Sequence, residues 1–224
     1  MKHRLHRSLV TPIAIFALTF LLCVPATPAK AESDPLAPEL NIEQIYQRAI
    51  EGDKDTQFSL FNAYRRGVGV ERSIDNAKRW LLSAADNGHT EAQYWLGYIL
   101  FFGKGVERDV EAGVGWYKKS ATQGSIHAQV ALGQIYNGWR YRFYPSDPAQ
   151  AIRWYTKAAE QGHLQSIFIV GCKNYFGIQQ LINVSEGLSW FQKAAERGDD
   201  TAIAYLKMDN NDDLNLFCHT VARR

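Results

Sequence analysis

The stretch WYKKSATQG at residues 116–124 recurs almost unchanged as WYTKAAEQG at residues 154–162. Related versions are WLLSAADNG at residues 80–88 and WFQKAAERG at residues 190–198, so the motif occurs four times, at intervals of 36, 38 and 36 residues. Repetition at a period of about 20–50 residues is typical of architectures in which one unit cannot bury its apolar face alone. The motif therefore predicts a stacked array of repeats.

Aligning the four copies reveals the two ends of one helix in each unit. The residues seven positions before the Trp column are Ser73, Asp109, Asp147 and Asn183. Such short polar side chains accept hydrogen bonds from the free N–H groups of a helix start. The residues eight positions after the Trp column are Gly88, Gly124, Gly162 and Gly198. Glycine suits the left-handed conformation that ends a helix, so each copy predicts a helix of about 13 residues.

Two further columns belong to the same helix. The Trp column itself holds Trp80, Trp116, Trp154 and Trp190. Three positions before it stand small residues, namely Ala77, Gly113, Ala151 and Gly187. Small residues let another backbone approach closely, so we expect the indole rings to pack between helices and to have no role in binding.

A second helix is predicted in the other half of the period. Leu60, Leu96, Leu132 and Val170 share one column. Tyr64, Leu100 and Tyr136 share a column four residues later, which is the spacing of one buried helical stripe. Gly-rich turns follow at residues 67–70 and 103–106. Each unit therefore reads as helix, turn, helix, turn, which predicts an all-α fold.

The order A-x-x-x-L-G, G-x-G-V, W-Y-x-K-A-A-x-x-G and A-Q, clearest over residues 92–129, resembles the Sel-one-like repeat family, a close relative of tetratricopeptide repeats. Departures occur in the first unit, where Phe61 replaces the Gly of Leu-Gly, and in the third, which lacks the G-x-G turn. The resemblance implies a right-handed α-solenoid of helix-turn-helix repeats, with a concave surface lined by the first helix of each pair. It also implies scaffold or adaptor roles, often in bacterial envelopes or the secretory pathway.

The repeats and their flanks divide the chain into eight segments. We expect a signal peptide at residues 1–31, a linker at 32–40, an N-terminal capping helix at 41–52, four repeats at 53–88, 89–124, 125–162 and 163–198, and a C-terminal cap at 199–224.

The first 31 residues have the layout of a secretory signal peptide. Basic residues at positions 2, 4 and 7 precede an apolar run over residues 9–24, and Ala29-Lys30-Ala31 forms an A-x-A cleavage site. The apolar run is shorter than the ~20 residues that a membrane-spanning helix needs, so an uncleaved anchor is the weaker alternative. We therefore expect cleavage after Ala31, a periplasmic or secreted protein, and no membrane insertion of the mature chain.

The charge balance argues against a nucleic-acid partner. The whole chain has 25 Lys and Arg against 23 Asp and Glu, a formal net charge of +2. Four of the basic residues and none of the acidic ones lie in residues 1–31, which leaves 21 against 23, or about −2, after cleavage. Nucleic-acid binding requires clustered positive charge to neutralise phosphates.

A second stripe of side chains lies beside the core stripe on each first helix. If the helix pairs stack as in tetratricopeptide arrays, this stripe faces the concave groove and aromatic anchors there suit a peptide or protein ligand. The alternative is that these rings pack against adjacent helices. The candidate partner-binding residues are Phe58, Asn62, Arg65, Tyr94, Tyr98, Phe101, Gln134, Asn137, Phe168 and Tyr175.

Two further features leave alternatives open. Trp139, Arg140, Tyr141 and Arg142 lie where the third unit loses its Gly turn, and they either form an accessory site for an acidic or carbohydrate ligand or brace a long turn. Cys172 and Cys218 either form a disulfide in an oxidising compartment or remain free thiols, because the sequence does not place their Cα atoms.

Familiar signatures of enzymes and metal sites are missing from the sequence. It contains no S-x-x-K, G-x-S-x-G, H-E-x-x-H or C-x-x-C motif, so we predict no catalytic residue, no metal and no cofactor. The predicted function is a non-enzymatic scaffold or adaptor that binds a protein or peptide. One alternative is an envelope enzyme or glycan-acting protein, for example related to β-lactams or peptidoglycan, and another is a structural assembly component.

Overall fold

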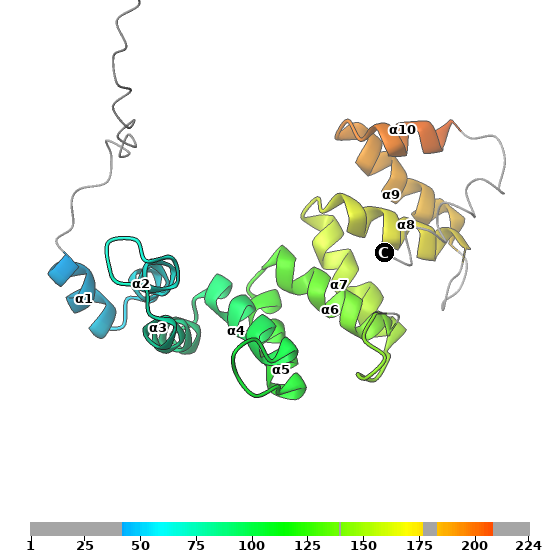
Figure 1. Ribbon diagram of the computed structural model, residues 1–224. Helices are drawn as coiled ribbons and strands as arrows, with labels where there is room; N and C mark the ends of the chain where they lie inside the picture. Colours follow the sequence, from blue (N-terminus) through cyan, green and yellow to red (C-terminus); the bar gives the residue numbers. More distant parts are fainter. Residues whose placement is uncertain (1–41, 139, 177–182, 208–224) are drawn as a thin grey trace, which may run out of the picture. The chain divides into compact units, whose positions relative to one another are not determined.

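The computed structural model describes residues 42–138, 140–176 and 183–207, which form ten α-helices and no β-strand (Figure 1). Each helix packs mainly against the helices before and after it in the chain. The helices are α1 (Ile42–Ile50), α2 (Lys54–Arg66), α3 (Ile74–Asp86), α4 (Thr90–Phe102), α5 (Val110–Thr122), α6 (Ile126–Asn137), α7 (Pro148–Glu160), α8 (Leu164–Phe176), α9 (Val184–Glu196) and α10 (Asp200–Leu206).

Four helix pairs, α2/α3, α4/α5, α6/α7 and α8/α9, make up the array, with α1 before the first pair and α10 after the last. The all-α solenoid of helix-turn-helix repeats is thus confirmed. The predicted signal peptide and linker lie outside the described residues. So do Cys218 and the part of the predicted C-terminal cap that follows Lys207.

The predicted helix ends are confirmed in the second helix of every pair. The side chains of Ser73, Asp109, Asp147 and Asn183 each accept a hydrogen bond from the backbone N–H three residues later. The four glycines after these helices have φ angles of 80° to 96°, in the left-handed region. Because both ends of α3, α5, α7 and α9 are specified locally, the repeat length is encoded in the sequence itself.

In the second, third and fourth pairs the first helix lies directly against the second because glycines remove the side chains between them. A Cβ atom on Gly113 of α5 would lie 2.7 Å from the backbone nitrogen of Phe101 in α4. A Cβ atom on Gly133 of α6 would lie 2.6 Å from the ring of Tyr155 in α7. Such spacing leaves room for neither methyl group, so the two glycines are needed for close helix packing.

In every unit the side chain directly after the Trp column is buried more deeply than the tryptophan itself. Leu81, Tyr117, Tyr155 and Phe191 are all buried. Of the four tryptophans in the Trp column, by contrast, only Trp190 is buried and the others are half-buried. A lysine three residues later places its Nζ over the indole at 3.7 Å in Trp116 and 4.0 Å in Trp190. The indoles therefore cover the edge of the core beneath cationic side chains.

A chain of buried glutamines joins consecutive units. Gln93 of α4 donates from Nε2 to the carbonyl oxygen of Ala85 at 3.0 Å, and its Oε1 accepts from Gln123 at 2.6 Å. The same arrangement joins Gln129 to Ala121 and to Gln161. Each glutamine thus satisfies a carbonyl at the end of one helix and fixes the position of the next helix pair.

Candidate protein-binding surface

Aromatic side chains of α2 and α4, the first helices of the first two pairs, are partly accessible. Phe58 of α2 stacks on His89, with ring centroids 4.2 Å apart. Tyr94, Trp95 and Tyr98 of α4 follow in a chain of edge contacts, with Trp95 lying 5.9 Å from Tyr94 and 6.0 Å from Tyr98. All five side chains are half-buried, so each supports its neighbour and still presents an accessible edge.

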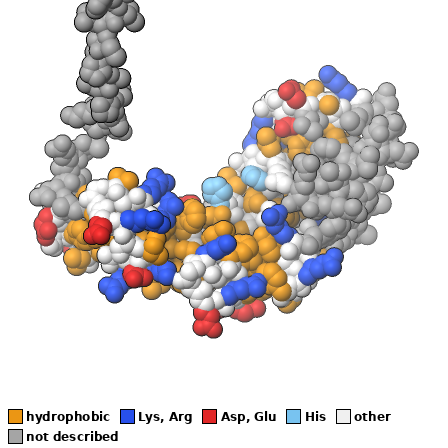
Figure 2. All heavy atoms as spheres, viewed as in Figure 1, with side chains coloured by type: hydrophobic (Ala, Val, Ile, Leu, Met, Phe, Trp, Pro, Cys, Tyr) orange, Lys and Arg blue, Asp and Glu red, His pale blue; other side chains and the backbone are white. Residues whose placement is uncertain are grey.

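The aromatic contacts continue to the C-terminal end of α4. Phe102 is exposed and packs against Tyr98, with centroids 4.9 Å apart. Figure 2 shows hydrophobic side chains gathered over the middle of the described chain, with Lys and Arg beside them. We call Phe58, Tyr94, Trp95, Tyr98 and Phe102 the aromatic surface.

Eight of the ten predicted partner-binding residues are at least partly accessible. They are Phe58, Asn62, Arg65, Tyr94, Tyr98, Gln134, Asn137 and Tyr175. Their binding role stays a prediction, since accessibility only makes contact with a partner possible.

The prediction was wrong for Phe101 and Phe168, which are buried core residues with exposures of 0% and 6%. The close approach of α5 at Gly113 covers Phe101 on one side, and the ring of Tyr141, at 5.2 Å, covers it on another. Phe168 packs against Phe191 at 5.9 Å. Helical spacing placed both rings on the groove stripe, but it does not record how closely the second helix approaches.

Trp95 and Phe102 were missed by the sequence analysis because each stands one residue beyond a position of the predicted stripe. A different signal was available, since five of the 13 residues of α4 are aromatic. That density exceeds what one buried stripe of a helix can hold, so part of it must lie outside the core.

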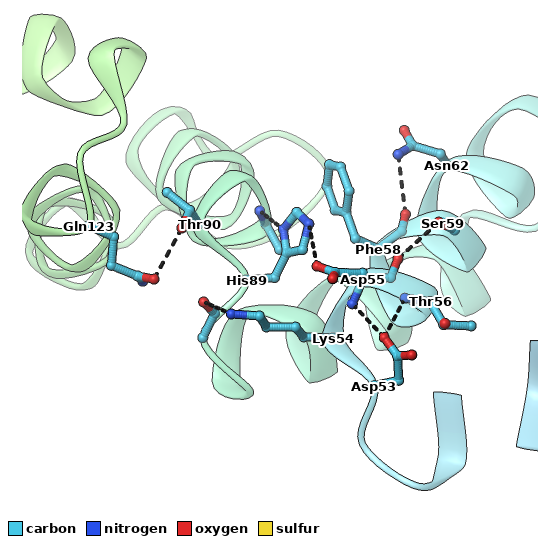
Figure 3. A network of polar contacts seen from close by, with 12 residues as sticks. Asp53, Lys54, Asp55, Thr56, Phe58, Ser59, Asn62, His89, Thr90 and Gln123 are labelled. Atoms are coloured by element: carbon cyan, nitrogen blue, oxygen red, sulfur yellow. Dashed lines mark hydrogen bonds and ion pairs between the residues drawn. The ribbon is translucent and has the colours of Figure 1, made fainter. Parts of the chain in front are cut away.

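A pocket of about 490 Å³ lies where the N-terminal ends of α2, α4 and α6 come together. Figure 3 shows its polar network, in which His89 stands between Asp55 and the start of α4. Its Nδ1 accepts the backbone N–H of Ala92 at 3.0 Å, and its Nε2 lies 3.6 Å from Asp55 Oδ1. Acceptance at Nδ1 requires the neutral ring with its proton on Nε2, where it faces the carboxylate.

Burial lowers the pKa of two histidines at these helix starts. For His89 the nearby Asp55 carboxylate opposes the shift, and for His163 the neighbouring His127 adds to it. His163 also accepts the backbone N–H of Ser166, at 3.2 Å. The two rings therefore act as neutral helix caps, and they fall in the column just after the helix-ending glycines.

The predicted accessory loop splits in two. Trp139 lies outside the described residues, and Arg140 and Arg142 are exposed. Tyr141 is half-buried and packs against Phe101 and Phe102, while the Arg108 guanidinium lies 4.0 Å above the ring of Phe143. These contacts favour the bracing alternative, because they hold the turn against the end of α4.

At the other end of the array, polar groups replace core residues. Lys173 of α8 is buried and donates from Nζ to Asn137 Oδ1 at 3.0 Å, and burial lowers its pKa to about 8. Cys172 is also buried and is disulfide-bonded. Because Cys218 lies outside the described residues, the pairing of Cys172 with Cys218 stays a prediction.

Comparison with known proteins agrees with this architecture. A Sel1 repeat protein from Oxalobacter formigenes is 34% identical with a TM-score of 0.53, and the match covers 58% of this chain and 96% of that one. The protective antigen c5321 of uropathogenic Escherichia coli, which displays an SLR fold, is 28% identical with a TM-score of 0.59, and the match covers 80% of this chain and 40% of that one. No curated protein matches the chain.

The sequence pattern of the Sel1 repeat matches four times, over residues 55–89, 90–125, 126–163 and 166–199. These segments cover more than half of the 224 residues and coincide with the four helix pairs. The chain therefore belongs to the Sel1 repeat family.

Proposed function

We propose that this protein is a non-enzymatic scaffold of the bacterial cell envelope that holds a protein or peptide on its first helices, the expected concave side of the array. Proteins with Sel1 repeats generally serve as scaffolds for protein interactions and are typically non-catalytic. The proposal adds a location and a binding surface to that general role.

The observation that carries the proposal is the aromatic surface. Tyr94, Trp95 and Tyr98 are accessible along one helix although the core of that unit is already filled by Phe101 and Tyr117. Tyr and Trp provide large contact areas with few rotatable bonds, so ordering them on binding costs little entropy. A surface of this kind suits an extended or helical segment of another protein.

The envelope location is supported by the signal-peptide layout of residues 1–31. In the part of the chain that the structure describes, no helix is long and apolar enough to cross a membrane. The disulfide at Cys172 suits an oxidising compartment such as the periplasm. We expect the leader to be removed after Ala31, which N-terminal sequencing of the exported protein would establish.

The binding surface can be tested by placing a photo-crosslinking amino acid at Tyr98 in intact cells. Leu82 of α3, an exposed apolar residue on a second helix, provides a control position. We expect a discrete crosslinked protein from position 98 and none from position 82. That protein, once purified, should bind Tyr98→Ser at least about tenfold more weakly than wild type, whereas Leu82→Ser should bind normally.

Two other results would overturn the proposal. Crosslinking of position 98 to a second copy of this chain alone, with self-association at low concentration, would indicate an assembly component. Turnover of a glycan or β-lactam that is abolished by single polar substitutions would indicate an enzyme. The Tyr98→Ser and Leu82→Ser variants are first checked for an unchanged thermal midpoint, because Tyr98 also contacts Trp95.

A further inference from the structure

Arg65 lies beside Trp95 of the aromatic surface, in the last turn of α2. Its guanidinium carbon lies 5.6 Å from the ring centroid of Phe61 and 5.7 Å from that of Trp95, so two rings from consecutive units hold the group in place. Its side chain donates one hydrogen bond, from Nη2 to Asn62 Oδ1, at 3.3 Å. The Nε atom is buried and has no acceptor within the described part of the chain.

No carboxylate of the described residues neutralises this cation. The ion pairs among the described residues join Arg48 to Asp53 and His89 to Asp55, and neither pair includes Arg65. An arginine has five N–H donors in a planar fork, and a partly desolvated guanidinium is usually paired with an anion. The Arg65 guanidinium is thus fixed in position by its neighbours, but no described carboxylate pairs with it.

The end of a helix attracts cations through its dipole, but this does not account for the position of Arg65. Arg66 occupies the same last turn and is exposed to water. The dipole would act on either residue, whereas only Arg65 is placed between two aromatic rings, those of Phe61 and Trp95. Arg66 is therefore a matched reference for the effect of charge alone.

The first helices are also polarised from end to end. Their N-terminal halves carry the acids Asp55 and Glu91. Their C-terminal halves, at residues 60–66, 96–102, 132–137 and 170–176, contain no Asp or Glu. The cations of these halves are Arg65, Arg66 and Lys173. Such an arrangement attracts negative charge to the C-terminal side of the surface.

We infer that Arg65, with Asn62, Trp95 and Tyr98, forms an acidic-residue subsite, in which an Asp or Glu side chain of a partner protein segment binds the guanidinium and an adjacent apolar side chain packs on the two rings. This inference rests on the proposed binding function and specifies the chemistry of the partner. Bidentate contact between a carboxylate and the planar fork of arginine gives both affinity and orientation.

The subsite can be tested with a library of random 12-residue peptides displayed on phage and selected on the immobilised full-length chain. Peptides enriched on the wild type should contain an acidic residue next to an aromatic or aliphatic one. A synthetic peptide from the selection is then made in two forms, with the acidic residue retained or replaced by its amide. Its affinity is measured at two salt concentrations for wild type, Arg65→Gln, Arg65→Lys and Arg66→Gln.

We expect Arg65→Gln to weaken binding of the acidic peptide about tenfold and to leave binding of the amide peptide unchanged. The substitution in the protein and the substitution in the peptide are then coupled in a double-mutant cycle. Arg65→Lys should restore only part of the affinity, since lysine lacks the planar fork. Arg66→Gln should change affinity less than about twofold. The thermal midpoint of each variant separates a loss of binding from a loss of folding.

The outcomes distinguish the two proposals. Enriched peptides without acidic residues, bound equally by wild type and Arg65→Gln, would overturn the subsite and leave the scaffold function standing. Equal losses from Arg65→Gln and Arg66→Gln would likewise overturn it, because general charge attraction would then suffice. Enrichment of no peptide would count against both proposals.

Discussion

At the scale of the single residue, the residue type that recurs most clearly in the repeats is not the one that is most deeply buried. The Trp column is the most visible repeat in the sequence, yet Tyr117, beside Trp116, is the residue that fills the slot left by glycine. A Cβ atom on Gly97 would lie 3.0 Å from the Tyr117 ring, and Tyr117 is 2% exposed. Conversely, the first unit has Phe61 in place of this glycine and the smaller Leu81 opposite, so total volume is maintained.

This difference predicts unequal costs for two adjacent truncations. Tyr117→Ala removes a fully packed ring and should lower the free energy of unfolding by roughly 3–5 kcal/mol. Trp116→Ala should cost only about 1–2 kcal/mol, because part of the indole is already in water. Urea titration followed by circular dichroism measures both. A larger loss for Trp116→Ala than for Tyr117→Ala would show that the assignment of the core column is wrong.

His89 makes folding sensitive to pH. Burial holds its folded-state pKa below the ordinary value of 6.5, so the unfolded chain binds a proton more readily than the folded one. The stabilisation is therefore complete above pH ~6.5 and decreases as the pH falls from there towards the folded-state pKa. Protonation of Nδ1 also breaks the cap on Ala92.

His89→Asn tests this effect, because asparagine accepts the same capping hydrogen bond and does not titrate. The thermal midpoint of the wild type should fall more steeply between pH 7.5 and 5.5 than that of the variant. Adding His163→Asn, at the equivalent cap of α8, to His89→Asn should reduce the slope of thermal midpoint against pH further. Identical slopes for all three proteins would refute a capping origin of the pH dependence.

At the scale of the element, the ends of the helices could be predicted and their mutual approach could not. Caps such as Asp109 and Asn183 act within one turn of chain, so a single sequence contains all the information. The burial of Phe101 and the bonds of Gln93 depend instead on a residue in a neighbouring helix. The repeated A-Q pair signalled that Gln93 and Gln129 have a common role, but the role required the carbonyl positions.

The fourth unit shows how the glutamine chain ends. Ile167 stands where Gln57, Gln93 and Gln129 stand in earlier units, and Arg197 stands where Asn87, Gln123 and Gln161 donate. Replacing both members of a buried hydrogen-bonded pair avoids leaving either one unsatisfied. The array therefore tolerates the loss of this hydrogen bond where both positions change together.

Helix α5 allows the packing of its pair to be separated from helix propensity. Gly113 and Gly115 both lie in its interior, where alanine is intrinsically preferred by about 1 kcal/mol. Gly115 is exposed, and a Cβ atom added there would meet no neighbouring atom within 4 Å, so Gly115→Ala should stabilise the protein by about 0.5–1 kcal/mol. Gly113→Ala should destabilise it, since its methyl group would meet the backbone of Phe101.

Chemical denaturation of the two variants at one pH gives the comparison directly. A stabilised Gly113→Ala would mean that α4 and α5 can move apart without cost, and the close contact would then not hold the pair together. A destabilised Gly115→Ala would contradict its exposure, because no packing contact is available to offset the gain in helix propensity.

At the scale of the whole molecule, the buried core is uneven along the array. The N-terminal cluster consists of Phe61, Leu81 and the alanines at positions 77, 84, 85 and 92. The C-terminal cluster contains many buried rings, among them Tyr117, Tyr155 and Phe191. Alanine removes much less apolar area from water than an aromatic ring, so the first unit gains less from burial.

Since each helix packs mainly on its neighbours in the chain, a weak unit can open without the rest. We therefore expect backbone amides of α2 and α3 to exchange with deuterium faster than those of α6 and α7. Leu81→Ala should accelerate exchange in α2 and α3 and leave α7 close to its wild-type rate, while Tyr155→Ala should do the reverse. If either substitution accelerated every helix equally, the array would unfold as one cooperative unit and nearest-neighbour stacking would not describe its stability.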